Sequence, residues 1–308
     1  MYTLSMPKER SHWLLARRVV DRLQPGPLAD AVLAFGEFLL AGAVAHDSPY
    51  YALGSAEARR TADRLHGTSL SDSFAPFRAL ASHRTDLGAQ GLAFGFGALS
   101  HLAADATFHP MIFSWTGDAE APPGDLRQGW HYRHQACETA LDLHLEALWG
   151  PSPARTFGAL VKEAGPELVP IDNVFSGGDS RAWIRAHRRL QRLFDLPFVA
   201  WAARVEAFWN RGGFGDTSGA FYSTGPVRHP AFEGILEWVD PVTGIPGSAS
   251  LDQLVDQTET LTLELAAEWE KAWTAGTVPF AGKIGLALDT GIPCDQDQTK
   301  RFFSAKWF

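Results

Sequence analysis

The spacing of apolar residues predicts a chain built from helices. An apolar stripe made by Leu14-Leu15, Val19-Val20 and Leu23 predicts a first helix, which ends at Pro25. The same periodicity, with proline or glycine near many of the ends, predicts further helices at about 27–46, 57–65, 86–109, 131–149, 153–165, 179–193, 195–210, 249–275 and 296–305. Residues 211–250 are expected to form a loop-rich insert, and no convincing alternation of polar and apolar residues predicts a strand. The predicted fold class is therefore all-α.

The composition supports a large core, since 45% of the 308 residues are hydrophobic. We expect one continuous domain, in which residues 1–150 form a helical core. Residues 151–308 would add helices and the loop insert that pack on this core.

Charge and cysteine content limit the function classes. A net charge of −8 gives the chain no global electrostatic footprint for duplex DNA or an anionic membrane. Two cysteines are too few for a disulfide framework or a thiolate zinc site, so a metal would need His, Asp and Glu ligands. Residues 1–10 lack the apolar core of a secretory signal, and residues 28–45 carry two acidic residues, which favours a buried helix over a membrane span. We therefore expect a cytoplasmic protein without a transmembrane segment.

The strongest chemical signal lies in the predicted helix 86–109. Nine of the eleven histidines fall in the first 150 residues. From residue 91 to 108 this helix is apolar or small on nearly every face, which indicates burial all round. His101, Asp105 and His109 recur within it at i, i+4 and i+8, close to one stripe. Because buried polar groups need a partner, and imidazole and carboxylate are good zinc ligands, these residues predict a metal site.

The helix 131–149 repeats this spacing with His134, Glu138 and Asp142. A core histidine with a carboxylate partner, or a solvated helix face, would give the same pattern. Further candidates lie near predicted helix ends: His12, Asp47 and His66. A carboxylate at a helix C-terminus is disfavoured by the helix dipole, so a cation near Asp47 would account for its position. For each of these three, an ordinary surface or capping role is an equally good interpretation.

Five ordered blocks resemble the zinc-dependent phospholipase C family, which shares its fold with zinc-dependent single-strand nucleases. The blocks are PKERSHW, with His12; GAVAHDSPYY, with Asp47; LHG, with His66; GALSHLAADATFHP, with His101, Asp105 and His109; and HQACETALD, with His134 and Glu138. Together they span residues 7 to 142. The resemblance implies a helical bundle that holds its metals between core helices.

Carried over position by position, the resemblance implies two or three zinc ions. Asp47, His66, His101 and Asp105 would hold the first, and the second would be held by His109, His134 and Glu138. His12, with Asp105 as a bridge, would contribute to a third. The glutamate at 138 is similar to the phospholipases, whereas the nucleases usually show aspartate there.

Two features depart from the secreted members of the family. Their third zinc uses the amino group of a mature N-terminal tryptophan, which this sequence does not provide. Three residues separate Asp105 from His109, where the secreted phospholipases have five; the shorter form resembles an intracellular subgroup.

The resemblance implies hydrolysis of a phospholipid or another phosphoester by a metal-activated water, with Asp47 as the residue that orients or deprotonates it. Tyr50, Tyr51 and Trp115 are candidates for the pocket mouth. A nuclease or phosphomonoesterase on the same scaffold is one alternative. The pair His46-Asp47 also suggests the His-Asp phosphohydrolases, although that class leaves His134 and Glu138 unexplained. A helical protein with structural zinc is the non-enzymatic alternative.

Overall fold

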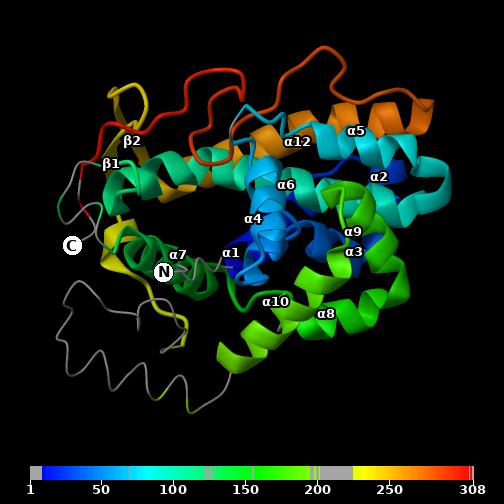
Figure 1. The fold of residues 1–308 in the computed structure, drawn as a ribbon, viewed down its shortest axis with the longest axis horizontal. Coiled ribbons are helices and arrows are strands. Elements are labelled where there is room, and N and C mark those ends of the chain that lie inside the picture. The colour runs from blue at the N-terminus through cyan, green and yellow to red at the C-terminus, as the bar shows by residue number, and fades with distance from the viewer. Residues whose placement is uncertain are drawn as a thin grey trace.

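The computed structural model is a mostly helical assembly around one long central helix (Figure 1). It describes residues 9–304 and 306, except 69, 122, 123, 125, 126, 128, 155, 195–197, 199, 200 and 202–224. The helices are α1 (Glu9–Val20), α2 (Pro27–Ala34), α3 (Gly36–Gly42), α4 (Ala56–Leu65), α5 (Ala75–Ser82), α6 (Arg84–Thr116), α7 (Trp130–Trp149), α8 (Phe157–Ala164), α9 (Leu168–Ser176), α10 (Ser180–Phe194) and α12 (Leu251–Ala275). A short 3₁₀ helix, Ser48–Tyr51, follows α3.

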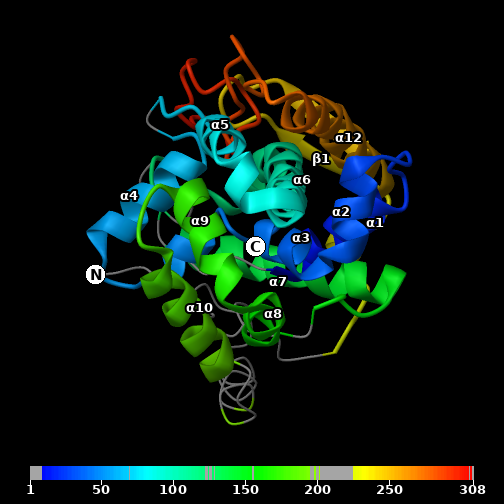
Figure 2. The same cartoon turned by 90° about the vertical axis from the view of Figure 1, so that its right-hand side faces the viewer.

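Helix α6 forms the axis of the fold, and Figure 2 shows it nearly end-on with the other helices around it. Nearly every residue from 91 to 116 in α6 is buried, as the apolar sequence predicted. Small residues allow α3 to lie against it, since a Cβ added at Gly97 would come within 1.9 Å of the Leu39 carbonyl oxygen. On another face the indole of Trp269, in α12, donates a hydrogen bond to the Leu92 carbonyl at 3.1 Å. The site-bearing helix is thus fixed by close backbone contacts.

The predicted fold class is confirmed, but several predicted elements were wrong in detail. The helix expected at 27–46 divides at Phe35, whose ψ of 51° is not helical. Helix α6 continues past Pro110 to Thr116. A proline leaves the carbonyl four residues earlier without its helical hydrogen bond, and Gly291 packs on that Ala106 carbonyl, where a Cβ would lie 2.4 Å from the oxygen.

In the second half of the sequence the observed elements differ more from the predicted ones. A two-stranded antiparallel hairpin, β1 (Ile235–Val239) and β2 (Pro246–Ser250), stands in the insert expected to lack strands. Helices α5 and α9 were not predicted. Residues 296–304 are not helical, and most of the helix predicted at 195–210 lies outside the described residues. Among the helices that are described, none has the combined length and apolarity needed to cross a membrane.

Residues 277–304 form a segment of turns and loops, here called the C-terminal strap, that contacts α4, α5 and α6. Its backbone bonds to the early part of the chain: Leu288 N–H donates to the His66 carbonyl at 2.9 Å, and Ser304 N–H donates to the Ser114 carbonyl at 2.9 Å. Gly285 N–H donates to the Asp72 carboxylate at 2.8 Å. These bonds bring residues near 290–300 beside the histidine-rich part of the chain.

Candidate metal centre

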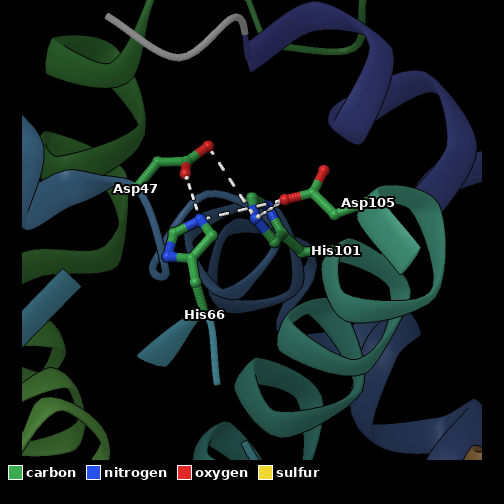
Figure 3. A group of neighbouring side chains, drawn as sticks. All are labelled: Asp47, His66, His101 and Asp105. Atoms are coloured by element: carbon green, nitrogen blue, oxygen red, sulfur yellow. Dashed lines mark hydrogen bonds and ion pairs between the residues drawn. The ribbon is translucent and has the colours of Figure 1, made fainter. Parts of the chain in front are cut away.

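The structure brings Asp47, His66, His101 and Asp105 together as a first cluster, with one ligand atom from each within 4.8 Å of all the others. They come from three places: the turn after α3, the C-terminal end of α4 and the buried middle of α6. Figure 3 shows their imidazole nitrogens and carboxylate oxygens pointing toward one another. All four side chains are buried.

Hydrogen bonds fix the orientation of both rings in this first cluster. The Nδ1 of His66 lies 2.8 Å from the Ala62 carbonyl oxygen, and the Nδ1 of His101 lies 2.8 Å from the Ala43 carbonyl oxygen. A carbonyl can only accept, so in each neutral ring Nδ1 carries the proton and Nε2 presents a lone pair. His66 Nε2 then lies 3.0 Å from an Asp47 carboxylate oxygen. Two acceptors at this distance need a cation or a proton between them.

A proton satisfies this need when no metal is bound. Burial lowers the pKa of His66, but the hydrogen bond and charge of Asp47, with Asp105, raise it to about 9. Two buried atoms, His101 Nε2 and Asp105 Oδ2, lie 3.0 Å apart but are not in hydrogen-bond geometry. Lone pairs that converge without donors are what a metal ion would satisfy. The donor set of the first cluster therefore fits a zinc ion.

His109, His134 and Glu138 form a second cluster, again within 4.8 Å of one another. Glu138 Oε1 lies 3.1 Å from His134 Nε2 and 3.5 Å from His109 Nε2. Burial raises the pKa of Glu138, but the two histidines lower it to about 2. Burial lowers the pKa of His109, whereas Asp105 and Glu138 raise it to about 10. Two imidazoles and one carboxylate leave a position open for water or substrate on a tetrahedral metal.

Asp105 connects the two clusters. Its Oδ2 faces His101, and its Oδ1 lies 3.7 Å from His109 Nε2 in the second cluster. The same Oδ1 is 3.4 Å from His12 Nε2, so the structure places His12 where a third ion could share this carboxylate. His12 also stacks on His101 with ring centroids 4.0 Å apart. Burial and the neighbouring His101 lower the pKa of His12 to about 4, so it is neutral and able to coordinate at neutral pH.

Asp142 shares the i+8 spacing of the sequence pattern but does not join the second cluster. Its two carboxylate oxygens accept hydrogen bonds from the backbone N–H groups of Arg10 and Ser11, at 3.3 and 2.8 Å. A carboxylate is stabilising at the first turn of a helix, where N–H groups lack partners. Asp142 therefore caps α1 and fixes the distance between His12 and α7.

Both clusters open into one pocket of about 260 Å³. Of the predicted aromatic residues Tyr50 lines this pocket, where its hydroxyl donates to Asp63 at 3.1 Å. The other two candidates, Tyr51 and Trp115, pack inside the protein and do not line this pocket. Tyr51 stacks on His187, and the Trp115 indole bonds to the Glu237 carbonyl. Phe113 and Trp130 line the pocket instead.

Sequence reasoning also missed a group of charges in the pocket wall. The Lys300 ammonium lies 3.0 Å from Asp118 and 3.0 Å from Asp289, and 4.2 Å from the centre of the Phe113 ring. Asp289 and Lys300 belong to the C-terminal strap, more than 150 residues from the nearest ligand. No local pattern in the sequence signals this contact, because it depends on the path of the strap.

The comparisons with known proteins agree with this geometry. A family model described as zinc dependent phospholipase C matches residues 11–188, which is more than half of the chain and includes both clusters. No curated protein and no solved structure gives a significant match. The extent of the match and the ordered histidine and carboxylate blocks within it lead to one conclusion: the chain belongs to the zinc-dependent phospholipase C family.

Proposed function

We propose that the protein is a zinc-dependent phosphoric ester hydrolase of the phospholipase C type, which cleaves a phosphodiester in a phospholipid or a related ester. The observation that carries the proposal is the shared carboxylate of Asp105. It joins a buried cluster of donors to a partly buried one, and both face one pocket. Two metals bridged by a carboxylate are suited to hold the attacking and leaving oxygens of a phosphoryl group. Family membership supports hydrolysis as the reaction class.

In this proposal the first zinc is held by Asp47, His66, His101 and Asp105. The second is held by His109, His134 and Glu138, and His12 with Asp105 forms a partial third site. When bound, zinc polarises phosphoryl oxygens and lowers the pKa of a coordinated water. The hydrogen bonds from His66 and His101 to backbone carbonyls hold the rings in the tautomer that presents Nε2.

Asp47 is the proposed catalytic carboxylate. One of its oxygens faces His66 at 3.0 Å, and the other lies 3.8 Å from His101. It lines the pocket, so it can orient a water and accept its proton while a phosphoryl group is held nearby. Around it, Tyr50, Asp63 and the Lys300 group make the walls polar, which suits a charged phosphoester and its headgroup better than an acyl chain.

The test compares zinc-free and zinc-reloaded protein on three substrates: a phosphatidylcholine analogue, single-stranded DNA and p-nitrophenyl phosphate. We expect zinc-dependent turnover that is fastest on the phospholipid analogue. His101→Ala should lose both first-cluster zinc and turnover. His83→Ala removes an exposed histidine just before α6 and should keep both.

The other outcomes separate the alternatives. Preference for DNA would indicate a nuclease, and preference for the monoester a phosphomonoesterase. Firmly bound zinc without turnover on any substrate would favour a structural role. Folded wild-type protein that binds no zinc would overturn the proposal.

A further inference from the structure

Glu9, Ser48 and His187 form a buried hydrogen-bonded chain next to the first cluster. His187 Nε2 lies 2.8 Å from Glu9 Oε1, and His187 Nδ1 lies 3.1 Å from the Ser48 hydroxyl oxygen. Tyr51 also donates its hydroxyl to Glu9 Oε1, at 2.5 Å. These residues come from α1, the 3₁₀ helix Ser48–Tyr51 and α10, and 178 positions separate Glu9 from His187. The chain therefore joins three distant segments.

Hydrogen-bond chemistry sets the direction of the link between His187 and Glu9. An ionised carboxylate can only accept, so His187 Nε2 carries the proton that it donates to Glu9. In the neutral ring Nδ1 is then an acceptor, and the single proton of the Ser48 hydroxyl is shared between this nitrogen and the Val44 carbonyl, each 3.1 Å away. The order carboxylate, imidazole, hydroxyl is the one found where a serine acts as a nucleophile.

Burial excludes that role here. Ser48, His187 and Glu9 are 2%, 0% and 5% exposed. The His187 ring is stacked on Tyr51 and on Phe157, with centroids 3.7 and 3.8 Å away. Ser48 and His187 are absent from the walls of the site pocket. A substrate cannot reach the hydroxyl. These hydrogen bonds can therefore only affect the position of other residues of the protein.

Each end of the chain leads to a residue of the candidate metal centre. Ser48 directly follows Asp47, and Glu9 lies three positions before His12 in α1. Ser48 also donates to the Val44 carbonyl at 3.1 Å, and the Asp47 carboxylate lies 3.0 Å from His66. Loss of the imidazole would remove the hydrogen bond that joins the residue after Asp47 to α10.

We propose that His187 is a positioning residue that holds Asp47 in place for the first metal through Ser48. This inference rests on the proposed function, because it requires that the first cluster binds zinc. Groups that orient metal ligands from outside the cluster typically change metal affinity about 10- to 100-fold when they are removed. Through His187, helix α10 would help to position a metal ligand although it contributes no residue to either cluster.

The test uses the two clusters as internal references. His187→Gln is combined with Glu138→Gln, which leaves the first cluster, and separately with His101→Ala, which leaves the second. Zinc affinity is measured for each by competition with a chelator, and the visible absorption of bound Co²⁺ reports coordination at the first cluster. We expect His187→Gln to weaken zinc at the first cluster by at least about tenfold and to alter its cobalt spectrum. Affinity at the second cluster should change by less than about threefold, since Asp47 takes no part in it.

Two further variants separate positioning from general loss of stability. Ser48→Ala cuts the link while keeping the imidazole, so it should reproduce the first-cluster effect. The two changes together should weaken zinc no more than either alone, because both break one connection. Trp183→Phe is the matched control, since it removes another buried hydrogen bond of α10, to Asp172, and should leave both affinities unchanged.

Equal weakening of both clusters, or no weakening of the first, would overturn the role of His187 while leaving the proposed function intact. Wild-type protein that binds no zinc would overturn both.

Discussion

Proton release on metal binding gives a direct test of how the two clusters are built. Without metal the pKa of His66 is raised to about 9 and that of His109 to about 10, so both rings carry a proton at pH 7. A metal must displace these protons before it binds. At pH 7 the competition lowers the apparent affinity about 100-fold at the first cluster and about 1,000-fold at the second, one factor of ten per pH unit below the pKa.

Isothermal titration of zinc into the metal-free protein measures this effect. Titrations at pH 7 in buffers of different ionisation enthalpy give the number of protons released, and we expect at least about two when both clusters fill, since Asp105 and Asp47 also raise the pKa of His101. His109→Gln should lower the count by about one, because it removes a ring that is protonated in the metal-free protein. The reasoning would be refuted if zinc bound at pH 7 with no proton release, since the imidazoles would then already be neutral.

Three further predictions concern stability, and thermal or denaturant unfolding measures each. Gly97→Ala should destabilise the protein by about 1–3 kcal/mol or more, because its Cβ would lie 1.9 Å from the Leu39 carbonyl oxygen. The control Gly36→Ala places its Cβ in open space and should not destabilise the protein. Equal effects of the two changes would contradict the close packing of α3 on α6. Lys300→Met should cost up to about 3–5 kcal/mol by leaving the buried Asp118 and the partly exposed Asp289 without their cation, and Lys300→Arg should recover part of this; an unchanged stability of Lys300→Met would show that the ammonium does not pair with them. Burial raises the pKa of Asp172 to about 6, so the stability that its protonated form contributes is complete below about pH 4 and is lost as the pH rises through 6. Asp172→Asn should therefore raise the melting temperature, relative to wild type, more at pH 7 than at pH 4. A gain that does not depend on pH would contradict this.

The sequence predicted the parts of the site that follow from local geometry. The i, i+4 pairs His101–Asp105 and His134–Glu138 face each other as helical spacing requires. Eight residues, however, turn an α-helix by about 80° beyond two full turns. This rotation explains why His109 joins the second cluster while His101 stays in the first.

The features of the site that could not be predicted from the sequence depend on packing between distant segments. The Asp142 carboxylate faces the start of α1 because α1 lies against α7, which helical spacing cannot show. Helix α6 continues through Pro110 although proline normally ends a helix, and the strap at Gly291 packs where the hydrogen bond is missing. Lys300 and Asp289 likewise reach the pocket only through the path of the strap.

The strap also gives the site an order of assembly during synthesis. Residues 47–138 supply both clusters and leave the ribosome well before residues 285–304, which form the wall with Asp289 and Lys300. Chains are synthesised from the N-terminus at about 5–20 residues per second, and a domain generally folds as a unit. The donor residues are therefore made several seconds before Asp289 and Lys300, and the pocket wall is complete only after the strap has been synthesised.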